Sequence, residues 1–164
     1  MRLDFVCGDE VYGACTELRE YLEDHDQAYV LRVPSSFRLI LAAGLTLTCK
    51  QAAARLGSRR GWEIRSAGTG SKGHRRYAWA WLATASPAHH LLIRRHLESG
   101  ELAFHYCYLP DGQPASPSRP VRAAGLRWPV GPQLPEPTLP TACGENRIAA
   151  VAASAAAVGS RYAR

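Results

Sequence analysis

An apolar run that ends abruptly in an acid constrains the fold of this chain more than any other feature. Residues 5–8 read FVCG, the next residue is Asp9, and Gly13 punctuates the chain shortly afterwards. A buried strand projects its last residue from the carboxyl edge of a sheet, which is where ligands collect. The pattern therefore predicts a strand over residues 3–8, with Asp9 as a metal ligand. The alternative is that Asp9 caps a turn before the next helix through its side chain.

The residues that follow predict a helix and a second strand. Within residues 14–24, Leu18, Tyr21 and Leu22 are spaced i, i+3 and i+4, which places them on one helical face. Residues 28–33 (AYVLRV) have the apolar, β-branched character of a buried strand. A helix that connects two strands in this way usually makes them parallel neighbours.

The middle of the chain changes to a pattern of strands and turns. Residues 50–56 predict a short helix that ends at Gly57, and four apolar or aromatic runs follow it. These runs cover residues 62–65, 77–83, 91–95 and 101–109. Glycine, proline and serine separate them, which is typical of an antiparallel β region. The turn at Ser99-Gly100 predicts a hairpin between the last two runs.

Two groups of side chains in these runs have a structural and a functional interpretation. Tyr77, Trp79 and Trp81 alternate along one predicted strand and so share a face. Such a stripe can stack on nucleic-acid bases, but it is more often part of a core, which is the interpretation we favour. Cys7 and Cys107 lie inside apolar runs, where a thiol stays protonated and inert as a nucleophile.

Charge is distributed unevenly along the chain. Residues 1–26 carry a net charge of −6, whereas residues 27–164 carry +12, which gives the total of +6. Because each phosphate contact releases counterions, a basic body favours a polyanion such as DNA as the partner. The alternative is a solvated basic surface without a specific partner.

The cysteines and the amino-terminal sequence bear on the cellular compartment. Five cysteines are widely spaced, and no pair has C-x-x-C spacing. This argues against a zinc ribbon and a disulfide scaffold, and fits a reducing cytoplasm. The start MRLDFVCGDE lacks the pattern of a signal peptide, and no run approaches the ~18 apolar residues of a membrane span. We therefore expect a cytoplasmic protein without a membrane partner.

Several segments, taken in order, resemble one protein family. They are GDEVYG (8–13), AYVLRVP (28–34), WEIRSAGTGSKGHRRYAWAW (62–81), LLIRRHLESGELAFHYCY (91–108) and AGLRW (124–128). Over roughly residues 4–130 the chain resembles the carboxyl-terminal half of bacterial insertion-sequence transposases of the DDE superfamily endonuclease type. The resemblance implies an α/β fold, partly ribonuclease-H-like, with a β-rich antiparallel insertion. In that family three carboxylates hold two Mg²⁺ ions for DNA strand cleavage and transfer, and Asp9 matches the second Asp.

The resemblance also implies that two of the three metal ligands are missing. The first Asp is expected well upstream, on a strand that this chain does not possess. Asp4 cannot replace it, because on an extended strand at ~3.3 Å per residue it lies about 16 Å from Asp9. That distance is too long for the two side chains to share metals about 4 Å apart. In the family pattern Tyr-x2-Arg-x3-Glu-x6-Lys, Arg127 matches the Arg, but Gly131 stands where the Glu belongs. We therefore expect a truncated transposase without cleavage activity, in which Asp9 alone binds Mg²⁺ weakly.

A basic loop is the candidate DNA contact. Residues 68–73 are rich in glycine, which lets backbone approach a phosphate, and basic side chains in and after this turn neutralise it. The DNA-binding candidates are Lys72, His74, Arg75 and Arg76, and the resemblance adds Arg127. The alternative is a solvated hairpin loop. The group Arg94-Arg95-His96 is interpreted as an ordinary charge cluster at a strand end.

These expectations divide the chain into three segments and leave more than one function open. Residues 1–60 are predicted to form a partial ribonuclease-H-like α/β segment, residues 61–128 the β-rich insertion, and residues 129–164 a divergent tail rich in Pro and Ala. One function is an inactive, truncated transposase, and the other is a non-catalytic, sequence-tolerant DNA-binding module. A gene remnant with an incomplete fold is the third possibility, and an oligomer is left open.

Overall fold

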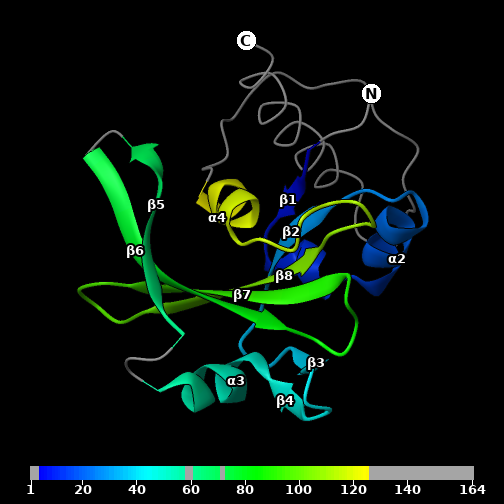
Figure 1. Ribbon diagram of the computed structural model, residues 1–164, viewed down its shortest axis with the longest axis horizontal. Helices are drawn as coiled ribbons and strands as arrows, with labels where there is room; N and C mark the ends of the chain where they lie inside the picture. Colours follow the sequence, from blue (N-terminus) through cyan, green and yellow to red (C-terminus); the bar gives the residue numbers. More distant parts are fainter. Residues whose placement is uncertain (1–3, 58–60, 71–72, 126–164) are drawn as a thin grey trace.

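A six-stranded mixed sheet with helices on both faces is the centre of the fold (Figure 1). The computed structural model describes residues 4–57, 61–70 and 73–125, without the side chains of 68–70 and 73–75. These residues form four helices and eight strands, and the strands of the main sheet lie in the order β1-β2-β8-β7-β6-β5. The protein is therefore of the mixed α/β class, as predicted, with a sheet that is mostly antiparallel.

The amino-terminal part forms the predicted unit of strand, helix and strand. Strand β1 (Val6–Gly8) pairs in parallel with β2 (Tyr29–Val33), which confirms the predicted parallel pair. Between them the chain forms two helices, α1 (Glu10–Ala14) and α2 (Thr16–Asp24), where one helix over residues 14–24 was predicted. Cys15 separates them because its backbone is extended, with φ −78° and ψ 107°.

The predicted antiparallel region is present and extends the same sheet. It consists of β5 (Glu63–Gly70), β6 (Gly73–Ala83), β7 (His89–His96) and β8 (Leu102–Tyr108), each antiparallel to the next. The predicted hairpin between β7 and β8 is confirmed, and Gly100 occupies its turn with φ +72°, a conformation that favours glycine. Strand β8 then pairs with β2, so residues before and after position 60 share one sheet.

A small hairpin and a helix leave the main sheet after β2. Strands β3 (Arg38–Ile40) and β4 (Thr46–Thr48) pair with each other and lead into α3 (Cys49–Leu56). The helix begins with a capping box between Thr48 and Gln51, which satisfies two backbone donors. It ends at Gly57, as predicted from the sequence. The β3–β4 hairpin was not predicted.

The two faces of the sheet have separate cores. One face packs against α4 (Ser118–Gly125) through Val30, Trp79, Leu92 and Val121. The opposite face packs against α2 and, around Leu91, against α3 with the β3–β4 hairpin. In Figure 1, α4 and α3 accordingly lie on opposite sides of β7.

The aromatic stripe belongs to the core beneath α4. Trp79 is buried, and Tyr77 and Trp81 pack against the same cluster with part of their surface exposed. This confirms the core interpretation of the stripe. Within the described part of the chain, none of the helices has the length and apolar character needed to cross a membrane.

Candidate functional site

Asp9 lies where the sequence predicted, immediately after β1 at the carboxyl end of the parallel pair. Its side chain is exposed, and its Oδ1 accepts a hydrogen bond from the Val11 backbone nitrogen at 3.0 Å. Asp9 is therefore the N-cap of α1, which confirms the capping interpretation. Capping occupies one acceptor site of the carboxylate and leaves the others directed to solvent.

The surroundings of Asp9 do not supply ligands for a pair of divalent ions. Glu10 is the adjacent carboxylate, but its Oε1 lies 3.2 Å from Nε of Arg32 in an ion pair. Among the described residues, three or more His, Cys, Asp and Glu side chains nowhere gather closely enough to hold a metal. Mg²⁺ keeps several waters and is commonly bound through one or two carboxylates, so these residues provide at most a weak, solvated site.

Arg32 lies at this edge, where α1 packs closely on β2. A Cβ atom at Gly13 would lie 1.9 Å from the carbonyl oxygen of Arg32, so only glycine permits this approach. The register pairs Gly8 with Leu31, which places Asp9 and Arg32 next along their strands at the same edge. The Arg32–Glu10 ion pair is about half exposed, so it contributes at most about 1 kcal/mol.

The predicted DNA-binding residues are only partly within the described structure. Arg76 lies on β6 and is exposed. His74 and Arg75 belong to the same strand, but their side chains fall outside the described residues. Lys72 and Arg127 also lie outside them. The role of this basic loop in DNA contact therefore stays a prediction.

The charge group at residues 94–96 is divided between the two faces of the sheet. The Arg94 guanidinium lies 4.8 Å from the ring centroid of Tyr77, on the face that α4 covers in part. The Arg95 guanidinium lies 4.2 Å from the ring of Trp62, on the opposite face. Successive residues of a strand alternate in this way, so the two arginines have different neighbours.

On the α4 face, Arg94 joins three other polar side chains. We call this set, Arg32, Trp79, Arg94 and His105, the arginine cluster. The strand register places Arg32 opposite His105 and Trp79 opposite Arg94. The rings of Trp79 and His105 are 6.4 Å apart, and both side chains are deeply buried, with 2% and 6% of their surface exposed.

Three atoms of the arginine cluster are buried without a hydrogen-bond partner among the described residues. They are Nε of Arg32, Nε1 of Trp79 and Nδ1 of His105. Oε1 of Glu10 lies 3.2 Å from Nε of Arg32, which is within ion-pair distance. The contact does not have the geometry of a hydrogen bond. Buried polar atoms are usually satisfied, so the cluster is an exception that calls for a physical explanation.

Burial and the two guanidinium groups both shape the electrostatics of the cluster. Burial, and then the charges of Arg94 and Arg32, lower the pKa of His105 to about 3. Burial also lowers the pKa of Arg94, and the charge of Arg32 acts in the same direction. His105 is therefore neutral at physiological pH, and the two arginines are close enough to repel each other.

One feature of the sequence signals this cluster. Arg32 is a charged residue inside the apolar run of β2, and a charge in a buried strand requires a partner. Its neighbours His105 and Arg94 are distant in sequence, so only the order and register of the strands bring the three together.

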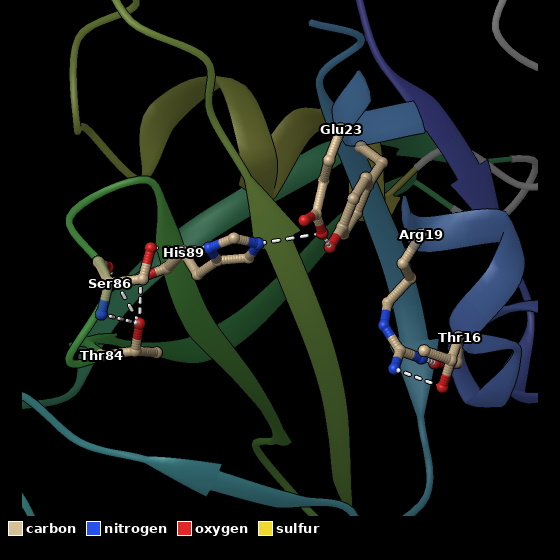
Figure 2. A network of polar contacts seen from close by, with 8 residues as sticks. Thr16, Arg19, Glu23, Thr84, Ser86 and His89 are labelled. Atoms are coloured by element: carbon tan, nitrogen blue, oxygen red, sulfur yellow. Dashed lines mark hydrogen bonds and ion pairs between the residues drawn. The ribbon is translucent and has the colours of Figure 1, made fainter. Parts of the chain in front are cut away.

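A second polar cluster lies on the opposite face and joins α2 to the turn between β6 and β7 (Figure 2). Oε1 of Glu23 accepts hydrogen bonds from the Tyr29 hydroxyl at 2.7 Å and from Nε2 of His89 at 3.0 Å. Oγ of Ser86 lies 2.8 Å from Nδ1 of His89. Because a carboxylate only accepts, Nε2 carries the hydrogen, and Nδ1 shares the second hydrogen bond with the Ser86 hydroxyl.

We call this set, Glu23, Tyr29, Ser86 and His89, the Glu23–His89 cluster. It contains the residue types of a hydrolytic triad, but its hydrogen bonds serve to join α2 to the turn. The Ser86 backbone N–H donates to Oγ1 of Thr84, and the His89 N–H donates to the Ser86 carbonyl. These N–H groups hold the turn, so neither is available to stabilise an oxyanion. Burial and the neighbouring Glu23 carboxylate raise the pKa of Tyr29 well above its usual range, which keeps the hydroxyl protonated as a donor.

The cysteine prediction is confirmed. Burial raises the pKa of Cys7 to about 12 and that of Cys107 well above its ordinary value. Both thiols are therefore protonated at physiological pH and do not act as nucleophiles.

Fold and site together define a mixed α/β protein with a capping carboxylate at the edge of its parallel strand pair and an arginine cluster beside it. No protein-family model matches the chain, and no curated protein matches it. A functional conclusion therefore depends on the residues of this chain alone.

Proposed function

We propose that this chain is a DNA-binding module descended from a DDE-type transposase, and that it does not cleave DNA by itself. The observation that carries the proposal is the unit β1-α1-α2-β2. Its strands are parallel, and Asp9 stands at their common carboxyl edge. This is the arrangement that the transposase resemblance implies for the second acidic residue of a ribonuclease-H-like fold.

The position of β1 in the sheet agrees with this ancestry. Among the described strands, β1 is the first in the sheet order, with β2 as its neighbour. The resemblance implies that the first Asp lies on a further strand of such a sheet, and β1 has one side without a neighbour among the described strands. The antiparallel strands β5 to β8 correspond to the β-rich insertion of the resemblance.

The absence of cleavage is proposed from the ligand set. Two-metal cleavage of a phosphodiester requires several carboxylates around ions about 4 Å apart, whereas Asp9 caps a helix and Glu10 pairs with Arg32. Gly131 occupies the position expected for the catalytic Glu. The test is a nicking assay on supercoiled plasmid with Mg²⁺ or Mn²⁺. We expect no cleavage above background, and cleavage that disappears in Asp9→Ala would overturn this part of the proposal.

The DNA-binding part of the proposal is supported by the net charge of +12 over residues 27–164. Because binding through phosphates releases counterions, affinity for duplex DNA should fall steeply with salt. In a plot of the logarithm of the binding constant against the logarithm of the salt concentration, each phosphate contact adds about −0.9 to the slope. Fluorescence anisotropy with unrelated duplexes measures this. We expect similar affinities for different sequences, and undetectable binding at low salt would end the DNA-binding proposal.

A further inference from the structure

We propose that the arginine cluster is a phosphate-binding site, and that within the proposed DNA-binding function it holds one phosphate of the DNA backbone. The cluster has two positively charged side chains and buried polar atoms without hydrogen-bond partners among the described residues. Arg32 and Arg94 lie on the same face of the sheet, opposite His105 and Trp79 in the strand register, and Nδ1 of His105 and Nε1 of Trp79 are buried without hydrogen-bond partners among the described residues. Like charges repel most strongly where burial reduces solvent screening, so an anion would stabilise this arrangement.

The acidic residues of the region do not cancel this charge. Glu10 pairs with Arg32, but both side chains are about half exposed. Tyr77 and, more weakly, Glu101 raise the pKa of Arg94, and Arg32 lowers it. At His105, the charges that act on the imidazole are those of the two arginines. The field at the buried imidazole is therefore positive.

The donors fit an oxyanion of the phosphate type. A guanidinium presents several N–H donors in a planar fork that matches two phosphate oxygens, and the cluster has two such groups. Arg32 is 41% exposed on its side chain and Arg94 is partly exposed, so an anion can reach them from solvent. The indole N–H of Trp79 is a donor only, and Trp79 is buried opposite Arg94 in the strand register, which makes this N–H a reporter of binding at the cluster.

The sheet itself provides a matched pair of variants. Arg94 and Arg95 are adjacent, each guanidinium lies over an aromatic ring, and they are on opposite faces. Arg94→Gln and Arg95→Gln therefore change the net charge equally and each remove one cation–π contact. A general electrostatic effect predicts equal losses of DNA affinity, whereas the proposed site predicts unequal ones.

The experiment measures the binding of a short labelled duplex by anisotropy at several salt concentrations. For Arg94→Gln we expect affinity about five- to tenfold lower than that of the unmodified protein, with a salt slope reduced by about 1. For Arg95→Gln we expect less than a twofold change. Glu10→Gln, which releases Arg32 from its ion pair, should strengthen binding two- to threefold, and Glu20→Gln on the exposed face of α2 serves as its charge control.

The phosphate site and the DNA-binding function can fail separately. Equal losses for Arg94→Gln and Arg95→Gln would overturn the site and leave the DNA-binding function standing. If the unmodified protein bound no DNA, inorganic phosphate would be tested by its effect on the melting temperature. Stabilisation that depends on Arg94 would then assign the site to free phosphate and reject the DNA function, and no stabilisation would reject both. If Arg94→Gln fails to fold, Arg94→Lys replaces it, because lysine keeps the charge and loses the fork, and an unchanged affinity would contradict the site.

Discussion

Two polar clusters lie on opposite faces of one sheet, and they differ in how completely their polar groups are paired. In the Glu23–His89 cluster, the carboxylate, imidazole and two hydroxyl groups are linked by hydrogen bonds of 2.7 to 3.0 Å. In the arginine cluster, three buried nitrogen atoms have no hydrogen-bond partner among the described residues, although Glu10 lies within ion-pair distance of one of them. A fully paired cluster stabilises the fold, whereas an incompletely paired one is a candidate for binding a ligand. The comparison predicts that mutations in the Glu23–His89 cluster mainly lower stability, whereas Arg94→Gln in the arginine cluster mainly lowers binding.

The largest expected effect is the pH dependence caused by His105. Its pKa is about 3 in the folded protein and 6.5 ordinarily, so the unfolded chain binds more protons between these values. The contribution of His105 to the free energy of unfolding is therefore fully present above pH 6.5. It is lost as the pH decreases towards 3, by up to about 1.4 kcal/mol per pH unit. Urea unfolding between pH 7 and 5 measures the slope, and His105→Gln should flatten it. An unchanged slope in this variant would show that the imidazole titrates normally.

The next effect tests the paired cluster. Glu23→Ala removes the partner of the buried Tyr29 hydroxyl and of His89, which we expect to lower the free energy of unfolding by about 2 kcal/mol. Glu20→Ala, an exposed position on the same helix, should change it by less than about 0.5 kcal/mol. Denaturant unfolding compares the two variants. Equal losses would mean that the Glu23–His89 cluster does not stabilise the fold.

A smaller effect is expected at Asp9, which separates capping from metal binding. Asp9→Ala should cost about 1 kcal/mol of stability through the lost cap, whereas Asp9→Asn should retain most of it, because asparagine caps equally well. Thermal unfolding in the presence and absence of Mg²⁺ checks both variants. A stabilisation by Mg²⁺ that both substitutions abolish would contradict the view that Asp9 acts mainly as a cap.

The smallest effect on stability is expected where binding is most affected. Arg94→Gln removes a cation–π contact with Tyr77 but also relieves the repulsion from Arg32, so the net change should be within about 0.5 kcal/mol. Chemical unfolding at neutral pH in the absence of phosphate measures it. A loss as large as that of Glu23→Ala would remove the contrast between the two clusters and assign both to the stability of the fold.

The elements that depend on local sequence were largely predictable. The parallel pair follows from a helix between two apolar runs, the end of α3 from Gly57, and the β7–β8 hairpin from the turn at Ser99-Gly100. The break at Cys15 was not predicted, because it depends on Asp9 capping a separate first helix. The helix propensities of the individual residues do not predict this break between α1 and α2.

Arg32 inside an apolar run is a sequence signal, but the membership of the two clusters was not predictable, because both are assembled by long-range pairing. Glu23 and His89 are 66 positions apart. Arg32 meets His105 only because β8 inserts between β2 and β7, and Arg94 meets Trp79 only in the register that β6 and β7 adopt. The basic loop that the sequence analysis favoured was conspicuous because its charges are contiguous, whereas the charges of the arginine cluster are dispersed along the chain.

The indole N–H groups offer the most direct measurement of the central claim. Nε1 of Trp79 is unpartnered within the described structure and lies in the arginine cluster, whereas Nε1 of Trp62 donates to the Gly57 carbonyl at 3.0 Å on the opposite face. In a ¹⁵N–¹H spectrum titrated with a short duplex, with the signals assigned by Trp79→Phe and Trp62→Phe, the Trp79 indole resonance should move and the Trp62 resonance should stay. A stationary Trp79 signal, or equal shifts of both, would contradict a phosphate-binding site at the arginine cluster.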